Sequence, residues 1–452
     1  MENSCLLAGY ARVCITPEES VPLAGYGNSS ARMSRNVLSD LYTACIAFSD
    51  ADGNTVLLFE NDLNESKQQY ITPIRQAISK AVGIPVEHIM VAATHTHSGP
   101  DLSNGDPSIE RYLKFLRRQM VRCAKEALAD RKPTVVSAAQ SKTKGISYVR
   151  HYLLKDGSYK GVNLNLFSDS PIVCHSSEPD PHLQLLRFTR LGGKDLVLMN
   201  WQCHPQRTGF GRFDISSDLV GVAREEMAAA LDCECIYFSG AGGNINPLSF
   251  DPDENHCEDY LAHGMALAQF ALEAKDRFTP VNASQVRFLM LTVQEPFQKP
   301  DESLLSDACD VVKYRTRVNN HRGGAAYAEA KGFHSQFHAS KLLEKHRLYQ
   351  EGIRHVNVLM QVFSIGDVAF VSVPYEMSDT NGKYIRDFSP FKATIIATCA
   401  NYTFSQVPSA YGFLCGSYET DCTYLTPGAG ERLAQRYVEL LKKLYVLQYG
   451  GQ

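Results

Sequence analysis

The sequence predicts a layered α/β protein, with a mixed β-sheet flanked by helices in a single large domain over residues 1–452. Short apolar, β-branched runs recur along the chain, longer amphipathic segments lie between them, and no linker rich in Pro, Gly or Ser divides the chain. Alternation of buried runs with helical segments is typical of α/β folds. The nearest candidate boundary, residues 251–258, is better explained as a surface loop.

Several short runs have the composition of buried strands. Such strands are nearly continuous stretches of apolar, often β-branched residues, because both faces of the sheet are covered. The runs are 86–94, 195–203, 234–241, 286–293, 355–365, 367–374 and 393–401. A Gly366-Asp367 pair beside run 355–365 predicts a tight turn and an antiparallel hairpin. The sheet is therefore expected to contain parallel and antiparallel strands.

Longer segments between these runs carry apolar residues at helical spacing. Apolar residues three or four positions apart line one face of a helix, which can then pack against a sheet. The segments are 64–81, 108–129, 217–231, 258–275, 324–349 and 430–447. Because they alternate with the strand-like runs, we expect helices to cover the sheet in layers.

Composition and charge exclude several classes of protein. Hydrophobic residues make up 44% of the chain and charged residues 21%, which favours an ordinary globular protein over a disordered one. The 45 Lys and Arg residues nearly balance the 49 Asp and Glu residues, so nucleic acid is not an expected partner. We find no export signal and no apolar run of about 18 residues, so stable membrane insertion is not expected. Thirteen cysteines without a CxxC pair indicate reduced thiols and a cytoplasmic protein.

Polar residues follow five of the predicted strands where each one ends. The endings are THTHSGP at 94–100, NWQCHP at 200–205, GAGGNINP at 240–247, PYE at 374–376 and ANY at 400–402. In α/β sheets, ligands bind outside the carboxyl ends of the strands. The five endings are therefore expected to meet at one crevice, which is the predicted functional site.

Histidines in two of these endings have the spacing of metal ligands. His95 and His97 are two residues apart, and in an extended backbone such a pair points to the same side. A catalytic zinc takes about three protein ligands and a water, and His204 and Glu376 can supply the remaining ligands. A lone histidine is more often a surface or core residue, and Glu376 has the alternative role of an acid in the first turn of a helix. The paired spacing nevertheless favours a Zn²⁺ site.

Further motifs are distributed over most of the chain. Besides THTHSGP, they are Asn200-Trp201 with His204-Pro205, Ser217-Asp218, Asn246-Pro247, the opening segments 9–17 and 25–27, and PGAGE at 427–431. Together they resemble the neutral (non-lysosomal) ceramidase family of zinc amidohydrolases. The resemblance implies a catalytic domain of lipid metabolism with zinc bound by His95, His97, His204 and Glu376. It also implies an arginine near the substrate amide, for which Arg150 is the candidate.

Two positions depart from the ceramide-cleaving members of that family. Asn246 stands where they have a serine, and Gln406 stands where they have a zinc-coordinating tyrosine, with Tyr402 and Tyr411 nearby. The sequence also shows no counterpart of the family's C-terminal immunoglobulin-like domain, so we expect a short ceramidase-like member. The expected substrate is a small-molecule or lipid-like N-acyl compound, shorter and more polar than long-chain ceramide. Asn246 replaces the serine of the ceramide-cleaving members, and a site that loses a polar partner for a substrate hydroxyl loses its selectivity for that substrate.

The predicted chemistry does not need the missing serine. Zinc lowers the pKa of bound water toward about 7 and polarises an acyl carbonyl, so hydroxide attacks in place of a side chain. Arg150, Gln406 and the carboxamide of Asn246 are the predicted catalytic residues, with Arg150 and Asn246 donating hydrogen bonds to the oxyanion. The open alternatives are a zinc hydrolase of esters or other acyl bonds and a ligand-binding relative that has lost catalysis.

Three more polar residues are candidates for supporting the ligands. Asp62 follows the apolar run 55–61 and Asp218 follows Ser216-Ser217, and either can accept the second N–H of a ligating histidine. Asp218 has the alternative of capping the helix that follows it. Asn244 lies in a Gly-Gly-Asn turn, where plain turn chemistry explains Asn244 and Asn246 equally well.

Overall fold

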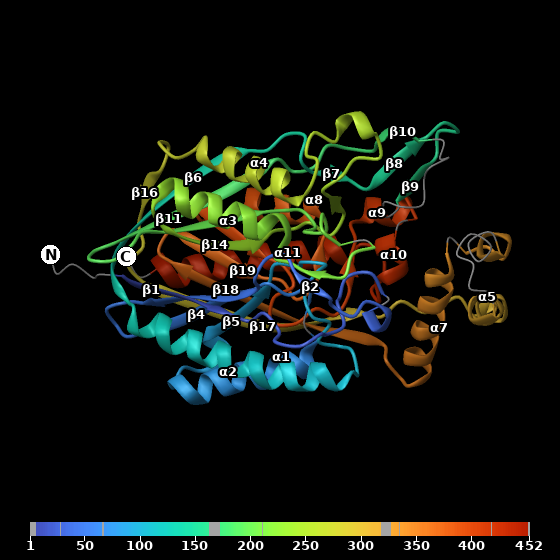
Figure 1. The fold of residues 1–452 in the computed structure, drawn as a ribbon, viewed down its shortest axis with the longest axis horizontal. Helices are drawn as coiled ribbons and strands as arrows, with labels where there is room; N and C mark the ends of the chain where they lie inside the picture. Colours follow the sequence, from blue (N-terminus) through green and yellow to red (C-terminus); the bar gives the residue numbers. More distant parts are fainter. Residues whose placement is uncertain are drawn as a thin grey trace.

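The computed structural model describes residues 6–27, 29–65, 67–161, 172–209, 211–317, 327–333, 335–416 and 418–450. Over these residues, two β-sheets pack face to face and helices cover the outer face of each sheet (Figure 1). The predicted layered α/β fold with a mixed sheet flanked by helices is therefore confirmed, with two main sheets in place of one.

The larger sheet has nine strands in the order β14-β12-β11-β6-β1-β3-β4-β5, with β16 also pairing with β6. Its strands are β1 (Leu7–Cys14), β3 (Tyr42–Ser49), β4 (Thr55–Asn61), β5 (Ile89–Ala93), β6 (Lys132–Lys142), β11 (His182–Arg190), β12 (Leu196–Trp201), β14 (Glu234–Ser239) and β16 (Thr279–Val281). The β4–β5 and β12–β14 pairs are parallel, and the other pairs are antiparallel.

The second sheet has four strands in the order β17-β18-β19-β21. They are β17 (Val286–Pro296), β18 (His355–Ile365), β19 (Val368–Ser372) and β21 (Ala393–Ala397). Strands β18 and β19 form the predicted antiparallel hairpin, and its turn places Gly366 at φ +57°, a left-handed conformation that glycine adopts without strain. Strands β19 and β21 are parallel.

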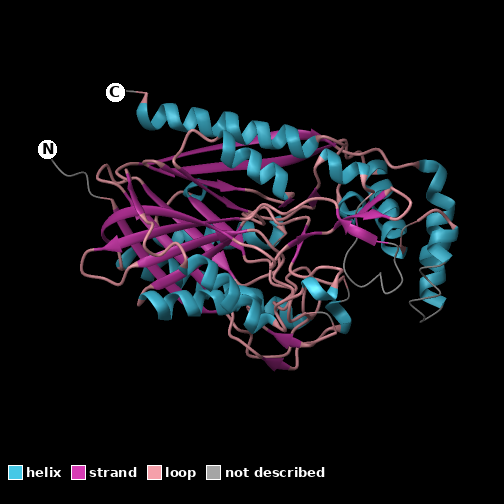
Figure 2. Cartoon of the chain, turned by 90° about the horizontal axis from the view of Figure 1, so that it is seen from above, coloured by secondary structure: helices cyan, strands magenta, loops and turns pink. Residues whose placement is uncertain are grey.

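Four helices cover the outer face of the larger sheet. They are α1 (Gln68–Val82), α2 (Pro107–Ala129), α3 (Asp218–Leu231) and α4 (Tyr260–Leu272). In Figure 1, α1 and α2 lie below the strands and α3 and α4 lie above them. The second sheet is covered by α8 (Asp379–Phe388) and α11 (Ala429–Tyr449), and α11 runs along the outer edge of the molecule to the C-terminus in Figure 2.

Alternation along the strands divides the core into layers. On β4, Leu57 and Phe59 face α1 and α2, whereas Val56 and Leu58 face the second sheet. Successive side chains of a strand point to opposite faces, so a strand between two covered faces must be apolar at every position. This is why the buried runs of the sequence lack polar alternation.

Helices α5 (Leu305–Arg317) and α7 (Gln336–Gln350) form a separate lobe at one end of the molecule (Figure 1). The single helix predicted over 324–349 is wrong, because Gly332 at φ +82° interrupts it and Ser335 caps α7, accepting a hydrogen bond from the N–H of His338. Residues 324–326 of that predicted helix lie outside the described residues.

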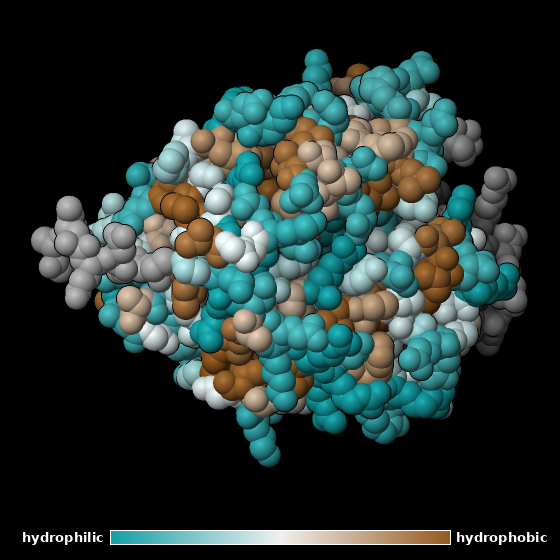
Figure 3. Space-filling model, turned by 60° about the vertical axis from the view of Figure 1, so that its left-hand side comes forward, coloured by the Kyte–Doolittle hydropathy of each residue, from teal (hydrophilic) through white to brown (hydrophobic). Residues whose placement is uncertain are grey.

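Apolar side chains on the face shown in Figure 3 lie in separate groups among hydrophilic ones. In the described part of the chain, no helix combines the length and apolar character that a bilayer crossing requires.

A buried ionic cluster joins α3 to the larger sheet. Arg224 of α3 contacts Glu60 at 3.0 Å and Asp62 at 2.6 Å, and all three side chains are at most 2% exposed. Burial alone would lower the pKa of Arg224, but the two carboxylates outweigh it and raise the pKa. Burial raises the pKa of Glu60 well above its usual value.

We predict that Arg224→Ala lowers the free energy of unfolding by about 3–5 kcal/mol, because two buried carboxylates lose their counter-ion. Arg436→Ala is the control, because Arg436 and Glu439 form an exposed pair that contributes little. Urea denaturation of both variants checks this, and equal stabilities would show that the buried cluster does not hold α3 in place.

Candidate metal centre

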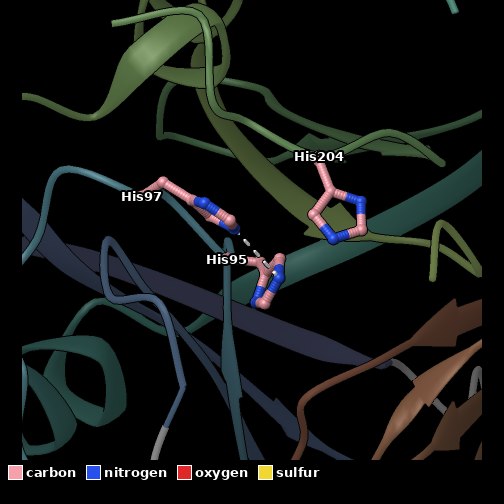
Figure 4. A group of neighbouring side chains, drawn as sticks. All are labelled: His95, His97 and His204. Atoms are coloured by element: carbon pink, nitrogen blue, oxygen red, sulfur yellow. Dashed lines mark hydrogen bonds between the residues drawn. The ribbon is translucent and has the colours of Figure 1, made fainter. Parts of the chain in front are cut away.

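Three histidine side chains meet where β5 and β12 end. His95 and His97 follow β5, and His204 follows β12. One ring nitrogen of each lies within 4.8 Å of the others, and all three residues are buried. Figure 4 shows the rings directed toward a common point, with the Nε2 atoms of His95 and His97 3.4 Å apart. The sequence-predicted convergence of the two strand endings is present in the structure.

The backbone brings His95 and His97 together differently from the extended pair we expected. His95 has φ +69°, in the left-handed region that non-glycine residues seldom adopt. Two backbone hydrogen bonds hold this conformation: His95 N–H donates to Leu63 at 2.9 Å, and His97 N–H donates to Pro205 at 3.0 Å. Such strain costs of order 1–3 kcal/mol and is found mostly at functional sites.

Backbone carbonyls set the tautomers of two histidines. Nδ1 of His95 lies 2.8 Å from the carbonyl oxygen of Asn64, and Nδ1 of His204 lies 2.9 Å from that of Ile245. A carbonyl oxygen only accepts hydrogen bonds, so each Nδ1 carries the proton and each Nε2 keeps its lone pair for a metal. Nδ1 of His97 has no hydrogen-bond partner among the described residues.

Glu376 completes the group. Its Oε2 lies 3.2 Å from Nε2 of His95 and 3.1 Å from Nε2 of His204. Ligands about 2.0–2.1 Å from a tetrahedral zinc are separated by about 3.3–3.5 Å, which is close to these two spacings. Glu376 thus lies beside His95 and His204, at the edge of the group that the three histidines form. Glu376 lies in β20 (Glu376–Met377), ahead of the first turn of α8, which excludes the alternative role of a first-turn helix acid.

Charges in the cluster are balanced for a cation. Burial would raise the pKa of Glu376, but His95 and His204 outweigh it and lower the pKa well below its usual value. Burial, followed by His95 and His204, lowers the pKa of His97 well below 6.5. The pKa of His204 is lowered by burial and then by Arg150. Burial would lower the pKa of His95, but Glu376 and Cys399 outweigh it and raise the pKa well above 6.5. A metal ion would therefore have to replace the Nε2 proton of His95, and the carboxylate and three neutral imidazoles that result are the donor set that zinc prefers.

Gln406 contacts this carboxylate directly. Strand β22 (Gln406–Val407) pairs in parallel with β20, so that Gln406 lies opposite Glu376. Its Nε2 donates to Glu376 Oε2 at 2.5 Å, and its Oε1 has no hydrogen-bond partner among the described residues. Tyr402 instead bonds through its hydroxyl to Leu359 and Asn357. Tyr411 lies against His151 and Tyr159, and neither tyrosine lines the cavity at the histidines.

Arg150 lies buried beside the histidines, just after β7 (Tyr148–Val149). Its Nη2 donates to the carbonyl of Gly243 at 2.5 Å, and its Nη1 lies 3.5 Å from Oδ1 of Asn246. Gln206 also donates to that oxygen at 2.9 Å, so the carboxamide oxygen of Asn246 faces two donors. Asn246 is fully buried and lies outside the set of residues that line the cavity, whereas Arg150 belongs to it.

The candidate supporting residues act on the backbone around the site. Asn244 exchanges two hydrogen bonds of 2.9 Å with Asp379, which opens α8 directly after β20. Asp218 accepts from the backbone N–H of Thr208 at 2.7 Å and so braces the segment after His204. Asp62 bonds to Arg224 and to the N–H of Tyr42. None of these contacts is with a histidine ring; the ring acceptors are the carbonyls of Asn64 and Ile245.

A cavity of about 290 Å³ opens onto the metal cluster. Its floor is formed by the three histidines, Glu376, Arg150 and Gln406. Its walls include Phe337 and Lys341 of α7, Tyr418, Tyr424 and Lys67. The sequence pattern did not predict these wall residues, because they lie outside the strand endings and meet only through the packing of α7 and α10 (Tyr418–Cys422).

The likeness of this chain to known proteins lies in its fold. No family model matches the chain. Among solved structures, the neutral ceramidase of Pseudomonas aeruginosa superposes with a TM-score of 0.69 and 16% sequence identity, covering 99% of this chain and 75% of that one. A ceramidase complexed with C2 superposes with a TM-score of 0.71 and 16% identity, covering 98% of this chain and 76% of that one. The chain therefore has a neutral ceramidase-like fold.

Proposed function

We propose that this protein is a zinc-dependent hydrolase that cleaves an amide (N-acyl) bond, with residues 1–452 acting as one catalytic unit. The observation that carries the proposal is the meeting of three buried histidines with ring nitrogens within 4.8 Å of one another, beside a carboxylate oxygen of Glu376 that lies 3.1–3.2 Å from two of them. The ceramidase-like fold supports the same class of reaction.

The donor set fits zinc better than a hard cation. His95, His97 and His204 offer nitrogen and Glu376 offers oxygen, whereas Mg²⁺ and Ca²⁺ prefer oxygen ligands alone. When bound, the ion supplies a Lewis acid that polarises an acyl carbonyl and lowers the pKa of a water molecule.

Arg150 is placed to bind the acyl oxygen of a substrate. It lines the cavity and its pKa is raised, because Glu419 outweighs the effect of burial, so the guanidinium stays charged. A charged donor aimed at developing negative charge contributes about 3 kcal/mol to the stability of a transition state. Asn246, which stands in place of the family's serine, accepts hydrogen bonds at Oδ1 from Arg150 and Gln206. It thereby helps to position the Arg150 guanidinium.

The cavity favours a substrate of modest size. A volume of about 290 Å³ is at the lower end of small-molecule pockets, which span about 300–1,000 Å³. Its walls combine aromatic rings with charged groups, including the Lys67–Glu65 pair at 2.9 Å and Lys341, whose partner Glu344 lies outside the lining. We therefore propose a short, polar acyl amide as the substrate, rather than long-chain ceramide.

We predict that the purified protein contains one zinc per chain and that His204→Ala loses most of it, because two imidazoles and one carboxylate make a weak site. Elemental analysis measures the metal, and His355→Ala, which removes an exposed histidine at the start of β18 and outside the cavity lining, serves as the control. Stoichiometric zinc in His204→Ala would refute the assignment of His204.

We predict that Gln406→Ala keeps its zinc but loses about 10-fold or more in turnover, because the amide orients the Glu376 carboxylate without binding the metal itself. Glu376→Ala, in contrast, is expected to lose zinc. Metal content and kcat measured on both variants decide the matter. Equal loss of zinc in the two variants would contradict these roles.

We predict that kcat/KM is highest for short N-acyl amines and falls as the acyl chain lengthens toward solubilised ceramide, because a cavity of about 290 Å³ encloses a short acyl group and leaves the rest of a long chain in water. Esters matched to the best amide test the alternative of an ester hydrolase. A clear preference for ceramide, or for the esters beyond their greater intrinsic reactivity, would overturn the proposed substrate.

A further inference from the structure

A buried carboxylate contacts Arg150 at a different nitrogen from the one that bonds to Gly243. Glu419 of α10 is 1% exposed, and its Oε1 accepts a hydrogen bond from Arg150 Nε at 2.5 Å. Its other oxygen, Oε2, lies 3.2 Å from Nε2 of His151, which is 2% exposed. Glu419 is not one of the four predicted metal ligands and does not line the cavity.

The guanidinium of Arg150 is held at each of its three nitrogens. Nε donates to Glu419, Nη2 donates to the carbonyl of Gly243, and Nη1 lies 3.5 Å from Asn246 Oδ1. The ring of Tyr418 lies 5.2 Å from the central carbon. A planar guanidinium with a partner at each of its three nitrogens is held in one orientation, whereas an unrestrained side chain samples many.

Charge makes Glu419 the decisive one of these contacts. The carbonyl and the carboxamide are neutral, whereas Glu419 brings a full negative charge into contact with the guanidinium. Arg150 also lines the same cavity as His97 and His204, the proposed metal ligands. A buried cation close to a bound divalent ion is repelled, and a carboxylate paired with it offsets that repulsion.

We propose that Glu419 is a positioning residue that holds the Arg150 guanidinium in the orientation needed to bind the substrate carbonyl. The proposal rests on the proposed function of Arg150. His151 holds Glu419 in turn, so that the sequence Arg150-His151 and the helix α10 form one buried network. In a purely structural role, Glu419 would stabilise the fold without affecting the chemistry.

A double-mutant cycle separates these roles. Glu419→Gln keeps the size of the side chain and removes its charge. Its effect on kcat is measured in the wild type and in the Arg150→Met variant. We expect Glu419→Gln alone to lower kcat at least about 10-fold with KM nearly unchanged and full zinc content. In the Arg150→Met background, we expect it to change kcat less than about 2-fold. Equal losses in both backgrounds would overturn the proposal.

Asp421→Asn is the matched control. Asp421 is another buried acid on α10, its pKa is raised to about 7 by burial, and its charged neighbours are Lys345, His338 and, more weakly, Glu419. If an acid on α10 acts only on folding, its loss lowers the thermal midpoint of unfolding and leaves kcat unchanged. We expect this result for Asp421→Asn. The same pattern in Glu419→Gln would contradict a positioning role.

Crystal structures of the zinc-loaded wild type and Glu419→Gln provide a readout that is independent of turnover. We expect the Arg150 guanidinium in the variant to leave the carbonyl of Gly243. An unmoved guanidinium would overturn the proposal whatever the activity. Failure of the proposed function is distinct, because the wild type would then hydrolyse no acyl substrate even with zinc bound.

Discussion

The structure depends on the meeting of three imidazole lone pairs and one carboxylate in a buried space. Nε2 of His95 and Nε2 of His97 lie 3.4 Å apart, and Nδ1 of His95 is bonded to a main-chain carbonyl. Such an arrangement is unfavourable in a protein interior unless a positive charge compensates it. A metal ion satisfies all four donors at once, which explains why the surrounding loops hold them so closely.

Backbone pairing, more than side-chain packing, positions these donors. Nδ1 of His95 and of His204 bond to main-chain carbonyls, and Gln406 reaches Glu376 because two-residue strands β20 and β22 align them. Each of these segments begins where a strand of one of the two sheets ends. The stacked sheets therefore act as the rigid support, and the short loops at their ends carry the chemistry.

Sequence patterns predicted the parts of the site that depend on residue type. The THTH spacing, His204 and Glu376 were found because imidazole and carboxylate are specific metal ligands. Gln406 was found because it aligns with the zinc-coordinating tyrosine of the ceramidase family. The carbonyls of Asn64 and Ile245 could not be found, because every residue has one. Glu419 lies 269 positions from Arg150, so only the fold brings them together. In the fold, strands such as β12 and β19 were predicted from their apolar runs, whereas the buried β3, the partly exposed β6 and the two-part α7 region were not.

The central claim is that these four side chains bind one zinc ion. Anomalous diffraction from crystals of the protein, recorded on both sides of the zinc absorption edge, tests it directly. The account predicts a single strong peak about 2.0–2.2 Å from Nε2 of His95, His97 and His204 and from a carboxylate oxygen of Glu376. A peak at another site, or none in crystals grown with zinc, would contradict it.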